Sequence, residues 1–326
     1  MKNYEPKEKF VKRMQELLGS EKDVEEFFKV AKTRSKKAIR VNTLKIKPDD
    51  LIERLIEKGW EVKQVFSNYP EILVVENRLG PGELGNSKEH ILGYYYVQEI
   101  TSMMPVIALG LNEDDKFLDL CAAPGSKTTQ ACALMKNKGV VIANEIDLKR
   151  VNILNFNLQR CGVTNSVVSC HDGNELVEKL QKLGFKFNKI LIDSSCSDEG
   201  NIRCNPKTFL EWSEGLLKSL SRKQKKIAGS AVELLEKGGE MIYSTCTHSP
   251  EENEEVVQYL LDNYDLEILD IKLPLKVRKG LVEWRGKKFN SDIKKAVRIY
   301  HHDNDMEGFF VCKIKKISDR KKGAGK

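Results

Sequence analysis

The sequence lacks an apolar run long enough to cross a membrane, and its start lacks a leader-like segment. Of its 326 residues, 40% are hydrophobic and 32% are charged, a balance typical of globular proteins. No apolar stretch approaches the ~18 residues that a spanning helix needs. The charged start, Met1 to Lys9, has no apolar segment of the kind found in secretory signals. These absences exclude membrane and fibrous classes and predict a cytoplasmic protein.

The cysteines also lack the spacing that is typical of a disulfide framework or a zinc site. Eight are scattered along the chain without a C-x-x-C pair, so we predict neither disulfides nor a zinc site. Most should be reduced, and several should be buried as small hydrophobic side chains. His301 and His302 resemble a turn before the last strand, and we predict no metal ion.

The positive charge is unevenly distributed. The net charge is +7, but residues 272–326 carry 17 Lys and Arg against 6 Asp and Glu, which leaves 38 against 42 for the rest. A second basic cluster, without an acidic residue, lies within residues 31–48. Each stretch alone fits solvated lysines equally well. Together they indicate two basic regions that flank a site for nucleic acid.

The length and the hydrophobic rhythm predict more than one folding unit. We expect a helical segment at 1–33, a small α+β module with a linker at 34–108, a large domain at 109–317 and a basic disordered tail at 318–326. In the large domain, apolar strands alternate with helices, as in a parallel sheet covered on both faces. The predicted fold class is therefore α/β, doubly wound, preceded by the small module.

Ligands of a doubly wound sheet lie beyond the carboxyl ends of its strands. The first of these ends, DLCAAPGSKT (residues 119–128), lacks the dinucleotide and phosphate-loop patterns, yet its small residues bring backbone N–H groups close to a ligand. The second ends in Glu145, which can accept both hydroxyls of a ribose. The third ends in Asp172, a candidate acceptor for an adenine amino group. This series predicts a nucleoside ligand without a pyrophosphate.

Two cysteines follow the next apolar strands. Cys196 lies in DSSCSDEG (residues 193–200) and Cys246 in YSTCT (residues 243–247). A cysteine at a strand end beside a helix N-terminus can act as a nucleophile, although small buried residues are the alternative interpretation.

These motifs, with AIRVNTLK, YYYVQE, IANEIDLKR, PEENE and EGFFVCKI, resemble the RNA cytosine-5 methyltransferase family of Sun/Nop2 type. The resemblance covers about residues 34–316. It implies a Rossmann-like methyltransferase domain, S-adenosylmethionine as cofactor, and an RNA-recognition-like module in front of it. The expected partner is a transfer or ribosomal RNA, with transfer RNA favoured, and the expected state is a monomer.

The resemblance also implies residue roles. Cys246 matches the nucleophile that adds to C6 of cytosine, Cys196 matches the cysteine that assists product release, and Asp193 matches the acid that hydrogen-bonds the base. The implied cofactor contacts are Cys121, Ala122, Ala123, Pro124, Gly125, Ser126, Lys127, Glu145, Arg150, Asp172 and Asp193.

One loop departs from the family pattern. The family has Pro before the second cysteine and Gly two positions after it, where this chain has Ser195 and Asp198. Because proline fixes φ, we expect a more pliable loop at Cys196. The added negative charge is expected to disfavour the Cys196 thiolate.

The target base must be turned out of its stack, which requires contacts to the RNA backbone in compensation. The candidate RNA-binding residues are Arg40, Asn42, Lys287, Lys288, Lys294, Lys295 and Arg298. The aromatic residues Trp284, Phe289 and Tyr300 are candidates either for base stacking or for the core.

Two other functions compete with RNA methylation. A catalytically impaired RNA-binding assembly factor of the same fold would bind RNA without methyl transfer. A DNA cytosine methyltransferase would take its nucleophile from a Pro-Cys segment, whose proline is absent here.

Overall fold

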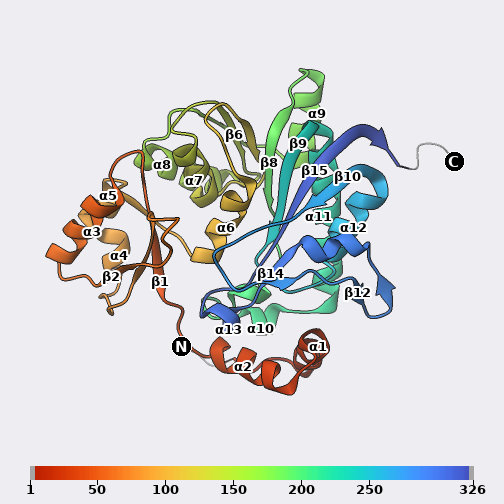
Figure 1. The fold of residues 1–326 in the computed structure, drawn as a ribbon, viewed down its shortest axis with the longest axis horizontal. Coiled ribbons are helices and arrows are strands. Elements are labelled where there is room, and N and C mark those ends of the chain that lie inside the picture. The colour runs from red at the N-terminus through yellow and green to blue at the C-terminus, as the bar shows by residue number, and fades with distance from the viewer. Residues whose placement is uncertain (1–3, 323–326) are drawn as a thin grey trace.

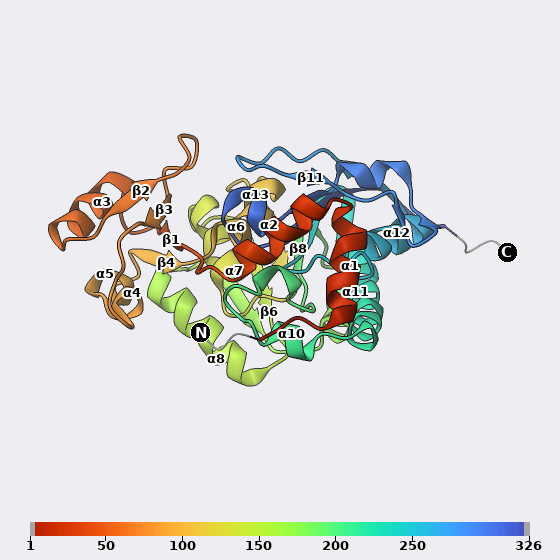
Figure 2. The same cartoon turned by 90° about the horizontal axis from the view of Figure 1, so that it is seen from below.

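The computed structural model describes residues 4–322 and begins with a pair of helices (Figure 1). These are α1 (Glu8–Leu18) and α2 (Glu21–Ala31), and both lie within the helical segment expected at residues 1–33. Gly19, with φ 70°, ends α1 in the left-handed conformation that glycine adopts at little cost. Both helices lie across the large domain (Figure 2), where Phe10 and Phe27 share a core with Trp212.

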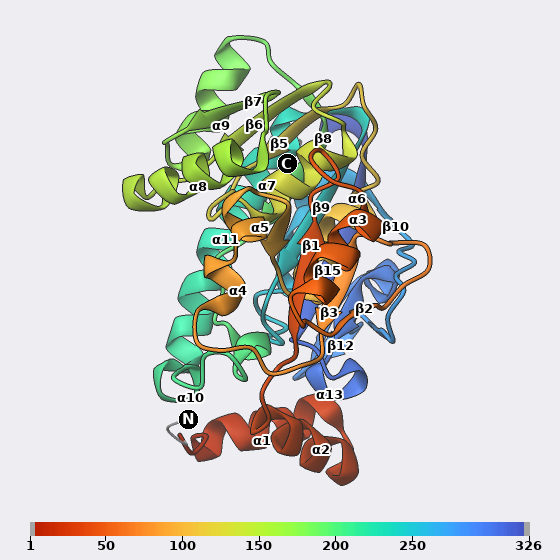
Figure 3. The same cartoon turned by 90° about the vertical axis from the view of Figure 1, so that its left-hand side faces the viewer.

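The small module has a four-stranded sheet in the order β2-β3-β1-β4 (Figure 3). Its elements are β1 (Lys37–Val41), α3 (Pro48–Glu57), β2 (Val62–Gln64), β3 (Ile72–Val75), α4 (Glu83–Asn86), α5 (Lys88–Ile91) and β4 (Tyr95–Val97). The strand-like segments AIRVNTL, WEVKQVF and EILVVE predict β1, β2 and β3, whereas YYYVQE is assigned from the sequence to the connection that leads into the large domain. That assignment is wrong, because β4 pairs with β1 and buries Tyr95 and Tyr96.

The large domain is built on a nine-stranded sheet. Five parallel strands come first in the chain and lie in the order β7-β6-β5-β8-β9. Their bounds are β5 (Lys116–Asp119), β6 (Val140–Asn144), β7 (Ser166–Ser169), β8 (Phe187–Asp193) and β9 (Leu235–Thr245). The strand order reverses between β5 and β8, which is where ligands bind in open α/β sheets.

Antiparallel strands complete the sheet. The strand β15 (Phe309–Lys321) pairs with β9 on one side and with β14 (Val297–Ile299) and β10 (Tyr264–Leu269) on the other. The short β11 (Arg278–Lys279) forms the edge, and β12 (Glu283–Trp284) and β13 (Lys287–Lys288) form a separate hairpin. The sequence pattern predicts β15 and misses the other five.

Helices cover both faces of this sheet. They are α6 (Ile100–Leu109), α7 (Ser126–Leu134), α8 (Leu148–Cys161), α9 (Gly173–Lys182), α10 (Thr208–Glu211), α11 (Glu214–Leu234), α12 (Glu254–Asn263) and α13 (His301–Asn304). One core lies under α9, α11 and α12, and the other lies under α6 and α7. Because Met103 and Leu109 of α6 pack against Phe117 and Leu191 of the sheet, we propose that the large domain begins near residue 99 rather than at residue 109.

The predicted disordered tail is wrong in its first part. The strand β15 continues to Lys321, which pairs with Tyr264, and the Ser318 hydroxyl donates to Asp265 at 2.7 Å. Residues 323–326 of the predicted tail lie outside the described residues. Among residues 4–322, the helices are all too short or too polar to span a membrane.

Candidate active site

The carboxyl ends of the parallel strands bring the predicted cofactor residues around one cavity. Its volume is about 470 Å³, within the usual range for small-molecule sites. Cys121, Glu145, Arg150 and Asp172 line it, as the sequence predicts. Two other parts of the wall are not predicted as cofactor contacts. One is Ser194 and Ser195 of the DSSCSDEG motif. The other is α11, which carries no recognisable motif and contributes Leu220, Lys223, Gln224, Lys226 and Ile227.

Glu145 is a buried carboxylate at the end of β6, 3% exposed. Its Oε1 accepts from the backbone N–H groups of Ile146 and Asp147 at 2.9 and 3.1 Å, and its Oε2 pairs with Arg150 at 3.0 Å. These contacts hold the carboxylate at the cavity wall. An oriented carboxylate of this kind can accept two hydroxyls of a ribose, and its charge complements a cationic ligand.

Asp172 begins α9 as its N-cap. Its Oδ1 accepts from the backbone and side-chain nitrogens of Asn174, each at 2.9 Å. The hydrogen bonds from Asn174 lower the pKa of Asp172, so it is a carboxylate at neutral pH. Two carboxylates, Glu145 and Asp172, therefore line one cavity. These hydrogen-bond acceptors fit the hydroxyl and amino groups of the nucleoside of S-adenosylmethionine, and their negative charge fits its positively charged sulfonium.

The predicted cofactor loop after β5 is only partly at the cavity. Ala122 and Ala123 pack inside a small core, and the Pro124 carbonyl accepts from Asn157 at 2.8 Å. Gly125 has φ 104°, and a Cβ there would lie 3.1 Å from a Leu154 methyl carbon, so glycine allows the close approach of α8. These residues shape the loop.

Lys127 is not among the residues that line the cofactor cavity. Its Nζ lies 2.7 Å from Asp193 Oδ2 and donates to Ser102 Oγ at 2.7 Å. The other oxygen of Asp193 accepts from the Ser244 hydroxyl at 2.9 Å. Lys127 therefore orients the predicted base-binding carboxylate, a role different from the cofactor contact that the resemblance implies.

The two candidate catalytic cysteines meet at the same sheet edge. Their sulfur atoms are 3.0 Å apart, and the Cys246 thiol also lies 3.1 Å from Asp198 Oδ1. The contact with Cys196, burial, and the nearby Asp198 and Asp193 carboxylates raise the pKa of Cys246 well above its ordinary value. The sulfur is therefore protonated at neutral pH. The charge of Asp198 acts on both sulfurs: it helps to raise the pKa of Cys246 and, as the sequence predicts, it also helps to raise the pKa of Cys196.

The loop that carries Cys196 is held firmly despite Ser195. The Ser194 N–H donates to the Ser244 carbonyl at 3.0 Å, and the Gly200 N–H donates to the Cys246 carbonyl at 2.8 Å. Ser197 adds a hydroxyl contact to Thr247 at 2.8 Å. The loop is thus hydrogen-bonded along the segment that carries Cys246, and these contacts oppose the pliability expected at Cys196.

The PEENE segment braces this loop before α12 begins. Glu252 accepts from the Ser197 backbone N–H at 3.0 Å and from Gln224 Nε2 at 2.9 Å. Burial raises the pKa of Glu252 to about 7. Its neighbour Glu251 pairs with the buried Arg13 of α1, so the N-terminal helices support the segment that follows Cys246.

Three of the predicted RNA-binding residues are buried, and their assignment is wrong. Arg40 donates to the Ser126 carbonyl at 2.7 Å and to Thr129 Oγ1 at 2.8 Å, and thereby joins the module to the cofactor loop. Asn42 donates to two backbone carbonyls at 2.8 Å. Arg298 forms an ion pair with Glu254 inside the large domain. None of these side chains is more than 2% exposed, so they cannot contact phosphates.

The remaining predicted RNA contacts stay at the surface. Lys287, Lys288 and Lys294 are exposed, and Lys295 is half-buried beside the Ile268 carbonyl. The hairpin β12–β13 is tied to the active-site side by Trp284, whose Nε1 donates to Glu251 at 3.2 Å. Trp284 and Tyr300 are buried, which favours the core alternative for both.

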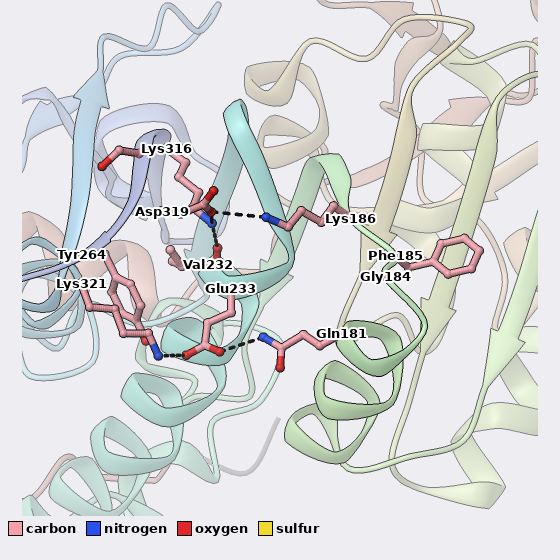
Figure 4. A pocket seen from close by; sticks show the side chains of 11 residues that line it. Gln181, Gly184, Phe185, Lys186, Val232, Glu233, Tyr264, Lys316, Asp319 and Lys321 are labelled. Carbon is pink, nitrogen blue, oxygen red and sulfur yellow. Dashed lines mark hydrogen bonds and ion pairs between the residues drawn. The ribbon is translucent and has the colours of Figure 1, made fainter. Parts of the chain in front are cut away.

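A second cavity, of about 350 Å³, lies beside the amino end of β8 (Figure 4). Its charged side chains neutralise one another, with Lys321 and Glu233 2.6 Å apart and Lys316 and Asp319 2.8 Å apart. It contains none of the predicted site residues.

The sheet order and the carboxylate-lined cavity at its switch point define a Rossmann-like methyltransferase. A family model described as 16S rRNA methyltransferase RsmB/F matches residues 106–315, and a model of the N-terminal domain of 16S rRNA methyltransferase RsmF matches residues 7–100. The chain therefore belongs to the RsmB/F family of RNA cytosine-C5 methyltransferases, for which S-adenosylmethionine is the methyl donor.

Individual relatives differ in their named substrate. The ribosomal RNA small subunit methyltransferase F of Vibrio campbellii is 36% identical over 316 residues, which are 95% of this chain and 63% of the relative. A tRNA (cytosine(49)-C(5))-methyltransferase of Pyrococcus abyssi is 37% identical over 308 residues, 94% of this chain and 97% of the relative. A crystal structure of a methyltransferase homolog from Pyrococcus horikoshii has a TM-score of 0.83 and 31% identity, with 95% of each chain covered. The chain thus spans less than two thirds of the Vibrio relative.

Proposed function

We propose that this chain methylates carbon 5 of cytosine in RNA through a covalent bond between Cys246 and C6 of the base. The observation that supports this function best is the pair of cysteine sulfurs, 3.0 Å apart, at the sheet edge that also carries the cofactor cavity. Because C5 of cytosine is a poor nucleophile, addition of sulfur to C6 is needed to make it reactive. The protein is proposed to act as a cytoplasmic monomer.

The residues of the site divide the work of this reaction. When bound, S-adenosylmethionine supplies an electrophilic methyl group. Glu145 and Asp172 bind and orient its nucleoside. Asp193, held by Lys127 and Ser244, hydrogen-bonds N3 and the exocyclic amine of the cytosine and stabilises the charge that develops on the base.

Transfer RNA is the proposed substrate class. The relative that matches this chain over 97% of its own length is named as a tRNA methyltransferase, whereas the Vibrio relative extends well beyond the match. Bisulfite sequencing of total RNA, with and without the gene, tests this proposal because it reports both the molecule and the position. A protected cytosine in ribosomal RNA alone would exclude the tRNA assignment.

Radiolabelled methyl transfer separates the proposed enzyme from the two alternatives. The enzyme incorporates methyl groups into RNA. An assembly factor binds RNA and incorporates none. A DNA methyltransferase labels DNA and depends on Cys196 as its nucleophile.

Replacing Cys196 by alanine is expected to trap the reaction after methyl transfer. If Cys196 assists elimination of the product, Cys196→Ala should accumulate a covalent protein–RNA adduct that resists denaturation, and Cys246→Ala should form none. Denaturing gel electrophoresis with labelled RNA measures the adduct. Normal turnover without accumulated adduct would show that Cys196 has no release role.

Neutralising the exposed lysines near the hairpin should weaken RNA binding. We expect Lys287→Gln, Lys288→Gln and Lys294→Gln together to reduce the slope of log affinity against log salt by up to about 3, roughly one for each phosphate contact. Filter binding over a salt series measures the slope. The matched control is the double variant Lys136→Gln with Lys138→Gln, which neutralises two exposed lysines that pair with Glu113. An equal change of slope in the control would indicate that RNA responds to the overall positive charge of the protein rather than to contacts at the hairpin.

A further inference from the structure

A carboxylate that the family pattern does not supply lies against the proposed nucleophile. Asp198 occupies the position of the expected glycine, and its Oδ1 is 3.1 Å from the Cys246 sulfur. Its Oδ2 lies 3.4 and 3.5 Å from the side-chain amides of Asn205 and Asn201. One oxygen is thus directed at the thiol while the other faces two amide donors.

The backbone at Asp198 fixes this direction. Its φ is 63°, in the left-handed region that few residues other than glycine, asparagine and aspartate tolerate. The Asp198 carbonyl accepts from the Asn201 N–H at 3.0 Å, and Gly200 is hydrogen-bonded to the Cys246 carbonyl. Strained backbone that is held by its surroundings concentrates at functional sites. The turn therefore presents the carboxylate to the sulfur in a defined position.

Other ionisable groups near the thiol are already engaged or cannot take its proton. The groups that face Cys246 are Cys196, Asp193 and Asp198. Asp193 is paired with Lys127 and accepts from Ser244. The hydrogen bond with Cys246 lowers the pKa of Cys196, but burial and the nearby Glu252 carboxylate leave that pKa raised overall, so that sulfur also carries its proton. Within residues 4–322, the hydrogen-bond partners of the Cys246 sulfur are Cys196 and Asp198, and a protonated thiol needs an acceptor before it can add to the base.

We propose that Asp198 is the proton acceptor of Cys246 in the addition step, an inference that rests on the proposed methyltransferase function. As the Cys246 Sγ–H bond breaks, its proton moves to Asp198 Oδ1 and its electron pair forms the Sγ–C6 bond. The C5–C6 π electrons move onto C5, which becomes nucleophilic. Once C5 carries the methyl group, its C5–H proton passes to water, and the electron pair of that bond re-forms the C5–C6 double bond as the Sγ–C6 bond breaks. The electron pair of the Sγ–C6 bond returns to sulfur, and sulfur takes the proton back from the Asp198 carboxyl.

The pH dependence of adduct formation tests this role. The single-turnover rate of the wild type should vary little between about pH 6 and 8. Asp198→Asn and Asp198→Gly, which both tolerate the left-handed backbone, should be about 10²-fold slower at pH 7. Their rates should rise about tenfold per pH unit, because only the spontaneous thiolate then reacts. Asp305→Asn alters the other described aspartate with positive φ, 54°, and should keep the wild-type profile.

An Asp198 that only keeps the Cys246 thiol protonated would have the opposite effect on the rates. If Asp198 merely holds the proton on sulfur, removing its charge lowers the pKa of Cys246 and makes both variants as fast as the wild type or faster at pH 7. That result would overturn the inference.

A readout without RNA separates this inference from the proposed function. Acrylamide is a conjugate acceptor, like the C5–C6 bond of cytosine, and its addition to Cys246 can be followed by peptide mass spectrometry across the same pH range. The exposed Cys170 is an internal control that should react identically in all variants. A wild type that methylates no RNA but shows the Asp198-dependent alkylation profile would refute the function and support the proton acceptor. If the wild type methylates RNA but the wild type and the Asp198 variants show the same alkylation profile, the result would support the function and refute the proton acceptor.

Discussion

Cys246→Ala is expected to reduce methyl incorporation into RNA by at least about 10⁴-fold, since removing an enzyme nucleophile typically costs this much or more. Without the sulfur no bond to C6 can form, and C5 stays unreactive toward the methyl group. Incubation of RNA with radiolabelled S-adenosylmethionine measures the loss. Binding of the cofactor should persist, because the carboxylates at its cavity, Glu145 and Asp172, belong to other strand ends.

Cys170→Ser is the matched control for this variant. Cys170 is an exposed cysteine with no proposed part in the reaction, so its replacement should leave methyl incorporation unchanged. Methyl transfer that survives Cys246→Ala but is lost in Cys196→Ala would exchange the two roles and favour the chemistry of DNA cytosine methyltransferases. Survival in both variants would exclude a covalent cysteine mechanism.

The sequence predicts several residues that line the cavity, because ligands of a parallel sheet bind beyond its strand ends. Glu145 and Cys246 come directly after β6 and β9, and Asp172 lies three residues after β7. The carboxyl ends of these parallel strands lie on the same side of the sheet. Order along the chain is therefore enough to bring these side chains together. The same reasoning cannot identify the cavity residues on α11, such as Lys223 and Ile227. The spacing of apolar residues in this helix indicates which face packs on the sheet, but it does not indicate which residues line a cavity.

Burial of charge is what the sequence does not reveal. Arg40 and Arg298 stand among other basic residues and resemble phosphate contacts, yet both are 2% exposed. Their partners are distant in sequence: Arg40 meets Ser126 and Thr129, and Arg298 meets Glu254. The contact of Asp198 with Cys246 is hidden for the same reason, since it joins two loops 48 residues apart.

Arg298→Met is expected to lower the free energy of unfolding by about 3–5 kcal/mol, because it leaves the buried Glu254 carboxylate without its partner. The guanidinium donates from Nε to Glu254 at 2.7 Å and also to the His248 carbonyl at 2.9 Å. Urea unfolding measures the change. The exposed Lys294→Met should remain within about 0.5 kcal/mol of the wild type.

Replacing Glu254, the partner of Arg298, makes this test specific. When Arg298→Met is combined with Glu254→Leu, no charge is left uncompensated, and well-packed apolar residues often replace a buried ion pair without loss. Most of the stability should therefore return in the double variant. If Arg298→Met instead unfolds like the wild type and loses RNA affinity with a reduced salt slope, the side chain contacts phosphate, and its assignment to the domain interior is wrong.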